Sequence, residues 1–231
     1  MIKTNINFKK NTIKSWDIIY LKNKHLSIWP WSDVVSYVSR YCIPRIRFNK
    51  ILELGCGAGA NIPFFLKNGY KYFGIDGSNT IIKSLKKKYS NISNNFLCND
   101  FTIEISINKT FDIVLDRGAI TCNDTISIKR TLHLIKKKLR PDGVFIGIDW
   151  MTKNHTSSLK GIKVDNYTRA NIRSGVFSNQ GTTHFFTRKH LSKLLKDSGF
   201  KLKILELKES KFLVGRKKLI HSAFNFLAIK I

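Results

Sequence analysis

A short run near position 50 constrains the fold more than any other part of the chain. The sequence Lys50-Ile-Leu-Glu-Leu-Gly-Cys-Gly-Ala-Gly-Ala60 begins with apolar residues typical of a buried strand and continues with Gly55, Gly57 and Gly59 on alternate positions. From Asn61 onward the apolar residues follow a helical spacing. A strand, a glycine turn and a helix let the backbone approach a ligand closely, because no Cβ stands in the way. We therefore expect an α/β fold with a ligand site at this turn.

The spacing of the glycines distinguishes between classes of ligand. Dinucleotide-binding folds use G-x-G-x-x-G, and phosphate loops use G-x-x-x-x-G-K-[ST]. This chain has E-L-G-C-G-A-G, in which Glu53 comes two residues before the first glycine and no Lys-Ser/Thr pair follows the last. A carboxylate at the end of the strand suits a cationic amine better than a pyrophosphate. The alternative is a tight strand-to-helix turn that binds nothing.

Acidic residues also end the next predicted strands. Asp76 closes the apolar stretch that starts at Tyr70, and Asp116 closes the stretch that starts at Phe111. An acid at the tip of the second strand is placed to bind the two ribose hydroxyls of an adenosine ligand, although Asp76-Gly-Ser78 could also form a turn and helix cap. The carboxyl ends of parallel strands share one edge of a sheet, so we expect Asp116 to face the boundary between cofactor and substrate. Asp116 could instead pair with Arg117.

Composition leaves the type of partner open. The net charge is +26, from 41 Lys and Arg against 15 Asp and Glu, and such a charge attracts polyanions. Abundant Lys, Ile and Asn are also expected of an AT-rich genome, and the lysines are dispersed. The four cysteines show no metal-binding spacing, so we expect no metal. No apolar run reaches the ~18 residues of a membrane span, and no signal segment begins the chain, which predicts a cytoplasmic protein.

These motifs, taken in order, resemble class I S-adenosylmethionine-dependent methyltransferases. The sequence L-R-P-D-G-V-F at 139–145 looks like the L-x-P-G-G that precedes the fifth strand in that family, with Asp142 in place of a glycine. The resemblance implies a Rossmann-like, seven-stranded, mostly parallel sheet of order 3-2-1-4-5-7-6, with an antiparallel last strand and helices on both faces. It implies S-adenosylmethionine as the cofactor. The residues that would bind it are Glu53, Gly55, Cys56, Gly57, Gly59, Asn61, Asp76, Gly77, Ser78, Asp100, Phe101, Asp116 and Arg117. Within that set, Asp100 would hydrogen-bond the adenine amino group and Phe101 would pack its ring.

We expect one domain over residues 1–231, built in four parts. Residues 1–46 form an N-terminal helical lid, and 47–150 form the cofactor-binding half. Residues 151–183 are polar and irregular, and a loop of this length is usually functional, so they form a substrate-facing insertion. Residues 184–231 form a helix and a terminal pair of strands. The tryptophans of the lid, Trp29 and Trp31, would either pack the lid onto the sheet or cover a bound ring.

Methyl transfer in this family is an in-line displacement, in which the protein mainly aligns the reacting atoms. A hydroxyl acceptor would gain from a general base, and the catalytic candidates are Asp116, Asp149 and His155. The candidates for substrate contact are Trp29, Trp31, His155 and His184.

A narrower resemblance points to small bacterial methyltransferases of surface-polysaccharide and sugar biosynthesis. It rests on Asp116-Arg-Gly-Ala-Ile-Thr121, Asn154-His-Thr-Ser-Ser158 and Thr183-His-Phe-Phe186, and implies a sugar or nucleotide-sugar acceptor. Two alternatives remain open: an RNA methyltransferase, favoured by the charge, and a cofactor-binding protein without catalysis. Against the RNA methyltransferase, the sequence shows neither an appended RNA-binding domain nor a [DNS]-P-P-[YFW] run, the motif common in enzymes that methylate base amino groups. Nothing in the sequence indicates an oligomeric state.

Overall fold

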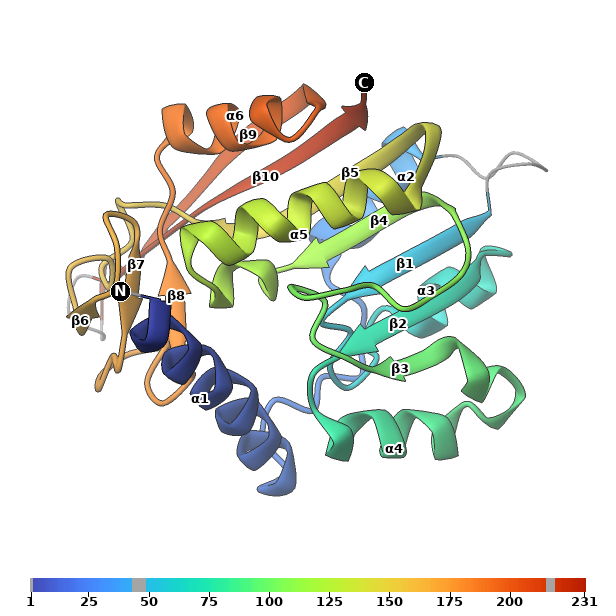
Figure 1. Ribbon diagram of the computed structural model, residues 1–231, viewed down its shortest axis with the longest axis horizontal. Coiled ribbons are helices and arrows are strands. Elements are labelled where there is room, and N and C mark those ends of the chain that lie inside the picture. The colour runs from blue at the N-terminus through green and yellow to red at the C-terminus, as the bar shows by residue number, and fades with distance from the viewer. Residues whose placement is uncertain (1, 43–48, 215–218) are drawn as a thin grey trace.

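A seven-stranded sheet forms the centre of the computed structural model, which describes residues 2–42, 49–214 and 219–231. The strand order is β3-β2-β1-β4-β5-β10-β9 (Figure 1). Only β10 runs antiparallel to its neighbours β5 and β9, and the other pairings are parallel. With β9 and β10 as the sixth and seventh strands, this confirms the expected order. The strands are β1 (Lys50–Leu54), β2 (Lys71–Asp76), β3 (Phe96–Cys98), β4 (Phe111–Arg117), β5 (Leu139–Met151), β9 (Phe200–Lys211) and β10 (Ile220–Lys230).

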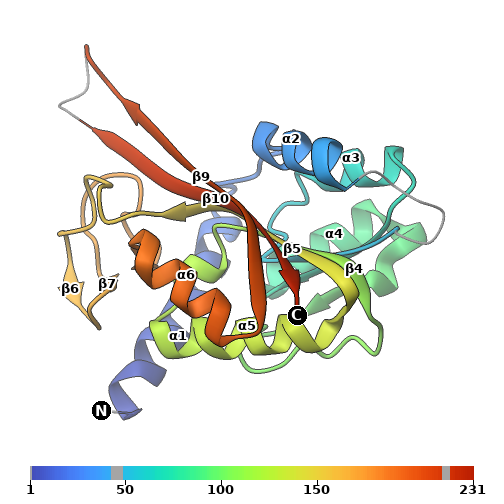
Figure 2. The ribbon, with the colours of Figure 1, turned by 90° about the horizontal axis from the view of Figure 1, so that it is seen from above.

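Helices cover both faces of this sheet, as expected (Figure 2). On one face lie α2 (Ser32–Tyr41), α3 (Ile62–Lys67) and α4 (Asn79–Lys88), and on the other lie α5 (Thr125–Lys138) and α6 (Arg188–Asp197). The alternation of side chains along β1 shows why two layers form. Leu52 and Leu54 join the core under α5 and α6, whereas Ile51 joins the core under α2, α3 and α4. A strand that is apolar on both faces must be covered on both.

The N-terminal helix α1 (Ile2–Leu21) lies beyond the carboxyl ends of β1 and β2, at the lower left of Figure 1. It packs against α4 and against the strand β8 (Thr182–His184). The contact with β8 includes a hydrogen bond from the backbone N–H of Thr182 to the Thr12 hydroxyl and a second one between the two threonine hydroxyls. One end of the sheet is therefore closed by a helix distant in sequence from the strands it covers.

The insertion at 151–183 is more regular than expected. It contains β6 (Ile162–Lys163) and β7 (Thr168–Ala170), which form a small antiparallel sheet with β8 in the order β6-β7-β8. Strands of two or three residues are too short for an alternating apolar pattern, so periodicity could not reveal them. No helix among the described ranges is long and apolar enough to span a bilayer.

Candidate functional site

The glycine turn between β1 and α3 uses backbone conformations that other residues rarely adopt. Gly55, Gly57 and Gly59 have φ angles of 65°, 50° and 77°. The turn is fixed to β2, because the backbone N–H groups of Gly55 and Cys56 both donate to the Ile75 carbonyl, at 2.7 and 3.1 Å. A Cβ on Gly57 would lie 3.0 Å from the Tyr20 hydroxyl. The backbone of Gly55 to Gly57 therefore leaves an open space facing Tyr20 of α1, which we call the cradle.

This cradle is one wall of a cavity of about 440 Å³ at the carboxyl edge of the sheet. Its other walls come from α1, from the ends of β2, β4 and β5, and from the insertion. Most of the site residues predicted from sequence line it together: Glu53, Gly55, Cys56, Gly57, Asn61, Asp76, Gly77, Ser78, Asp100, Phe101, Arg117, Asp149 and Trp31. The remaining five, Gly59, Asp116, His155, His184 and Trp29, are not among its lining residues.

Glu53 presents a buried carboxylate to the cavity. One carboxylate oxygen accepts from the Tyr72 hydroxyl at 2.5 Å and the other from the Asn61 amide at 2.8 Å. Burial raises the pKa of Glu53 to about 7, although both hydrogen bonds act in the opposite direction. Asn61 in turn accepts the backbone N–H of Trp31 at 3.1 Å. The side-chain amide of Asn61 thus connects Glu53 near the end of β1 to Trp31 at the start of α2.

Asp76 stabilises the turn that follows β2 and also faces the cavity. Its carboxylate accepts the backbone N–H groups of Gly57 at 3.0 Å and Ser78 at 2.9 Å, and it lines the cavity. The helix cap itself is Ser78, which accepts from Ile81 at 3.3 Å and donates to Asp17 at 2.5 Å. Burial raises the pKa of Asp76. The carboxylate is therefore held rigidly while it faces the cavity.

Asp100 lies in the turn that follows β3. It accepts from the backbone N–H and the hydroxyl of Thr102, at 2.9 and 2.7 Å. The neighbouring Phe101 is buried and also lines the cavity. A carboxylate and an aromatic ring thus lie beside each other at this end of the cavity.

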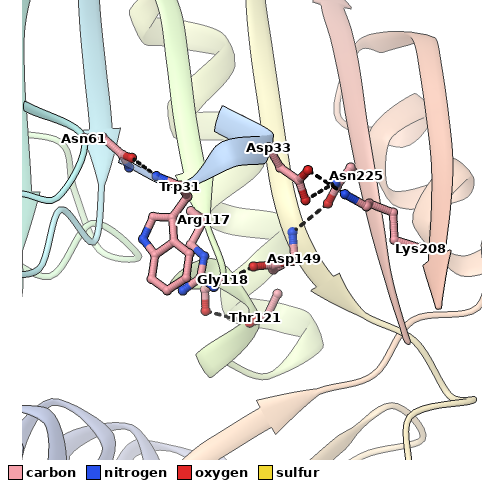
Figure 3. A network of polar contacts seen from close by, with 9 residues as sticks. All are labelled: Trp31, Asp33, Asn61, Arg117, Gly118, Thr121, Asp149, Lys208 and Asn225. Atoms are coloured by element: carbon pink, nitrogen blue, oxygen red, sulfur yellow. Dashed lines mark hydrogen bonds and ion pairs between the residues drawn. The ribbon is translucent and has the colours of Figure 1, made fainter. Parts of the chain in front are cut away.

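Arg117, Asp149 and Trp31 meet at the other end of the cavity (Figure 3). The guanidinium of Arg117 binds the Asp149 carboxylate at 2.7 Å and lies over the Trp31 ring, 3.5 Å from its centroid. Asp149 has a φ of 58°, and its backbone N–H donates to the Asn225 side chain at 2.9 Å. The Asn225 amide also donates to Asp33, which forms an ion pair with Lys208. The network joins α2 to β4, β5, β9 and β10.

Asp116 does not line the cavity, contrary to the expectation that it faces the boundary between cofactor and substrate. It is fully buried, and one of its oxygens accepts the backbone N–H groups of Ala119 at 3.1 Å and Ile120 at 2.8 Å. The other accepts the indole N–H of Trp150 at 2.8 Å. Burial raises its pKa to about 7. Its carboxylate therefore secures the turn after β4, and the acid that pairs with Arg117 is Asp149.

The two histidines expected at the acceptor, His155 and His184, lie in the protein interior. His184 is bonded to Thr168 at 2.8 Å and His190 at 3.1 Å, and burial lowers its pKa to about 3. His155 accepts the backbone N–H of Ser157 at 3.0 Å, and its pKa is lowered to about 4, chiefly by burial. The His155 ring does not line the cavity. It packs edge-on against the ring of His221, which does, with ring centroids 5.4 Å apart.

Two further positions differ from the expectation. Trp29 is 76% exposed and is not among the residues that line the cavity, whereas Trp31 is. Gly59 serves packing, since a Cβ there would come within 2.8 Å of the side chains of both Ile62 and Leu85. Sequence reasoning missed five lining residues with aromatic rings: Trp16, Tyr20, His25, Phe177 and His221. The helical spacing of Trp16 and Tyr20 indicates a shared helix face, but not what that face covers.

A family model described as a methyltransferase domain matches residues 29–204. No curated protein sequence matches the chain significantly. Among solved structures, an S-adenosylmethionine-dependent methyltransferase of Methanosarcina mazei is 18% identical, with a TM-score of 0.66, over 88% of this chain and 99% of that one. The 1,6-didemethyltoxoflavin-N1-methyltransferase of Burkholderia thailandensis is also 18% identical, with a TM-score of 0.66, over 98% and 90% of the two chains.

A third structure with the same fold is the S-adenosylmethionine-bound amino pentose methyltransferase of Micromonospora echinaspora. It is 15% identical, with a TM-score of 0.58, over 86% of this chain and 90% of that one. Likenesses at this level of identity establish the fold, while the family model spans most of the chain. The chain therefore belongs to the methyltransferase-domain family and is an S-adenosylmethionine-dependent methyltransferase.

Proposed function

We propose that the cavity binds S-adenosylmethionine with the residues expected from the sequence that line it. The Gly55–Gly57 backbone would accommodate the methionine part, beside Glu53. Asp76 would receive the ribose hydroxyls, and Asp100 with Phe101 would hold the adenine. Supporting this, a Cβ at Gly57 would enter the cradle, and a carboxylate that accepts two backbone N–H groups, as Asp76 does, still has lone pairs for hydroxyl donors.

We further propose that the acceptor is a small molecule with sugar-like hydroxyl or amino groups. The observation that carries this is the wall of the cavity made by α1 and the insertion, through Trp16, Tyr20 and Phe177. A space of about 440 Å³ is within the ~300–1,000 Å³ typical of small-ligand pockets. The cofactor and acceptor would have to share it. The amino pentose methyltransferase has a related fold, which is consistent with such an acceptor.

The cofactor supplies a methyl group that is already activated by its positively charged sulfur. The task of this chain is then to align the acceptor and to exclude water, and alignment alone can contribute ~7–11 kcal/mol. Of the catalytic candidates expected from sequence, only Asp149 lines the cavity. Its carboxylate is held by Arg117 and its backbone by Asn225. We assign to Asp149 the role of orienting the acceptor group and receiving its proton.

Calorimetry with S-adenosylhomocysteine tests the cofactor part of this proposal. The wild-type protein should bind it in a saturable manner, and Asp76→Ala should weaken binding at least tenfold. Unchanged affinity in a folded variant would contradict the ribose assignment. Asp142→Asn is a suitable control, because Asp142 is exposed and does not line the cavity.

Methyl-labelled S-adenosylmethionine, added with enzyme to a heat-treated extract of the source cells, tests the acceptor part. We expect the label in the small-molecule fraction. Label confined to RNA, together with steeply salt-dependent RNA binding, would favour an RNA methyltransferase instead. Cofactor binding without label in any fraction would support a non-catalytic protein.

A further inference from the structure

We propose that the acceptor is an organic amine that carries no phosphate group, so that the enzyme methylates nitrogen. This inference deepens the proposed function and rests on it. It separates amino sugars and other amines from nucleotide-activated sugars, which the sequence leaves equally open.

The charge of the cavity is opposite to that of the whole chain. The chain contains 41 Lys and Arg against 15 Asp and Glu. Among the described residues that line the cavity there is no lysine, and Arg117 is the one arginine. Four carboxylates, those of Glu53, Asp76, Asp100 and Asp149, line the same space. Bound S-adenosylmethionine has a net charge of only +1. Even without Glu53, whose pKa is raised to about 7, the other three carboxylates outnumber the positive charges of the cofactor and Arg117.

Arg117 does not offer a free positive charge to an anionic acceptor. Its guanidinium forms the 2.7 Å ion pair with Asp149, and one of its faces is covered by Trp31. The Nε atom is buried without a hydrogen-bond partner, so it offers no exposed donor to a phosphate. A phosphate, which needs several charge-assisted donors, would have to break the pair and leave Asp149 unpaired.

The remaining wall favours a cation. Trp16 and Tyr20 from α1 and Phe177 from the insertion bring aromatic rings to the cavity. Aromatic faces attract ammonium groups, and so does the Asp149 carboxylate on the opposite side. An amine would be drawn in as a cation, pass one proton to the Asp149 carboxylate and react as the free base. Its nitrogen lone pair then bonds to the methyl carbon as the carbon–sulfur bond breaks. The electron pair of that bond stays on sulfur, and the product leaves as a methylated ammonium ion.

Binding of charge-matched probes tests the inference without knowledge of the natural acceptor. Benzylamine, benzyl alcohol and benzyl phosphate share a ring and differ in charge. With the S-adenosylhomocysteine-loaded protein, tryptophan fluorescence should report benzylamine binding at least tenfold tighter than benzyl phosphate. Equal affinities, or tighter binding of the phosphate, would overturn the inference.

The Asp149→Asn variant sharpens this comparison. It keeps a residue that tolerates a φ of 58° but leaves Arg117 without its partner. Benzylamine should then bind about tenfold more weakly and benzyl phosphate more tightly. Asp142→Asn is the matched control, because Asp142 has a similar φ of 61° and does not line the cavity. Identical behaviour of the two variants would contradict the role of Asp149.

Separating the labelled extract by charge tests the same inference with natural acceptors. After unreacted S-adenosylmethionine, itself a cation, has been removed, small molecules retained by a cation exchanger should carry the label. Label in the neutral or anion-exchanger-retained fraction would overturn the inference but leave the proposed small-molecule function intact. Label in RNA alone, or in no fraction, would overturn both.

Discussion

The guanidinium of Arg117 lies over the indole of Trp31, 3.5 Å from the ring centroid, and so connects the end of β4 to the residue before α2. The same tryptophan donates its backbone N–H to Asn61, next to the glycine turn. One residue of the N-terminal region is therefore attached to both halves of the cavity. Trp31 thereby becomes part of the cavity wall.

Replacing Trp31 with alanine should weaken cofactor binding. The change removes the stacked ring, which is worth ~0.5–2 kcal/mol in such contacts, and leaves the Arg117–Asp149 pair more hydrated. We expect a 3- to 30-fold rise in the dissociation constant for S-adenosylhomocysteine, measured by calorimetry. Trp29→Ala is the control, because Trp29 is 76% exposed and outside the cavity lining. Equal effects of the two substitutions would refute the role given to Trp31.

Gly57→Ala should reduce cofactor affinity beyond what backbone strain explains. Its Cβ would enter the cradle, 3.0 Å from the Tyr20 hydroxyl. Gly69→Ala imposes similar strain, since Gly69 has a φ of 77°, but its Cβ meets nothing within 4 Å. Both variants should lose about 1 kcal/mol in free energy of unfolding, measured with urea. Only Gly57→Ala should lose tenfold or more in affinity, and a similar loss in Gly69→Ala would argue against a cradle at the turn.

Glu53→Gln should make stability less dependent on pH. Burial raises the pKa of Glu53 from 4.5 to about 7, so the folded protein holds this proton more tightly than the unfolded chain. Its contribution to stability is therefore fully present below pH 4.5 and is lost as the pH rises through about 7. Glutamine is neutral. Its amide oxygen can accept from Asn61, and its amide N–H can donate to the Tyr72 hydroxyl oxygen, which reverses the direction of that bond.

The variant should thus exceed wild type by about 1–3 kcal/mol in free energy of unfolding at pH 8 and match it near pH 4. Urea unfolding at both pH values measures this difference. Glu104→Gln, which removes the same charge from an exposed site, should show no such divergence. Parallel pH profiles for Glu53→Gln and wild type would mean that Glu53 titrates as in the unfolded chain.

His184→Ala should destabilise the protein without altering the site directly. The ring is fully buried, is bonded to Thr168 and His190, and packs on Phe186 with ring centroids 4.3 Å apart. Its loss leaves a cavity and unpaired polar groups, at about 2–4 kcal/mol of unfolding free energy. The affinity of the folded fraction for S-adenosylhomocysteine should stay within twofold of wild type at 15 °C. A large drop in affinity with normal stability would restore the substrate-contact role expected from sequence.

Local chemistry made much of this molecule predictable. The resemblance to class I methyltransferases implied one sheet order, and β1 to β5 with the terminal pair confirm it. Gly55 and Gly57 need left-handed backbone, and Asp76 falls where a strand ends, so short stretches of sequence suffice to identify them. The cofactor followed from these motifs together, and the family model confirms it.

Side chains whose partners come from distant segments were not predictable in this way. Asp116 lies near the end of a strand, as Asp76 does, yet its carboxylate accepts hydrogen bonds from the Trp150 indole and from two backbone N–H groups. Asp149 reaches the cavity because Asn225 and Arg117 hold it in a left-handed conformation. The periodicity of apolar residues indicates which face of a helix or strand is buried, but not which residues pack against that face.

The sequence by itself determined the fold, the glycine cradle and the cofactor class, because these depend on backbone conformations and on patterns within a few residues. Only the tertiary structure decided which carboxylate faces the cavity, that His155 and His184 are interior residues, and that α1 forms a wall. It also showed that a chain with a net charge of +26 holds an acidic cavity. Net charge is a sum over all residues, whereas a ligand responds to the few charges that folding brings around it.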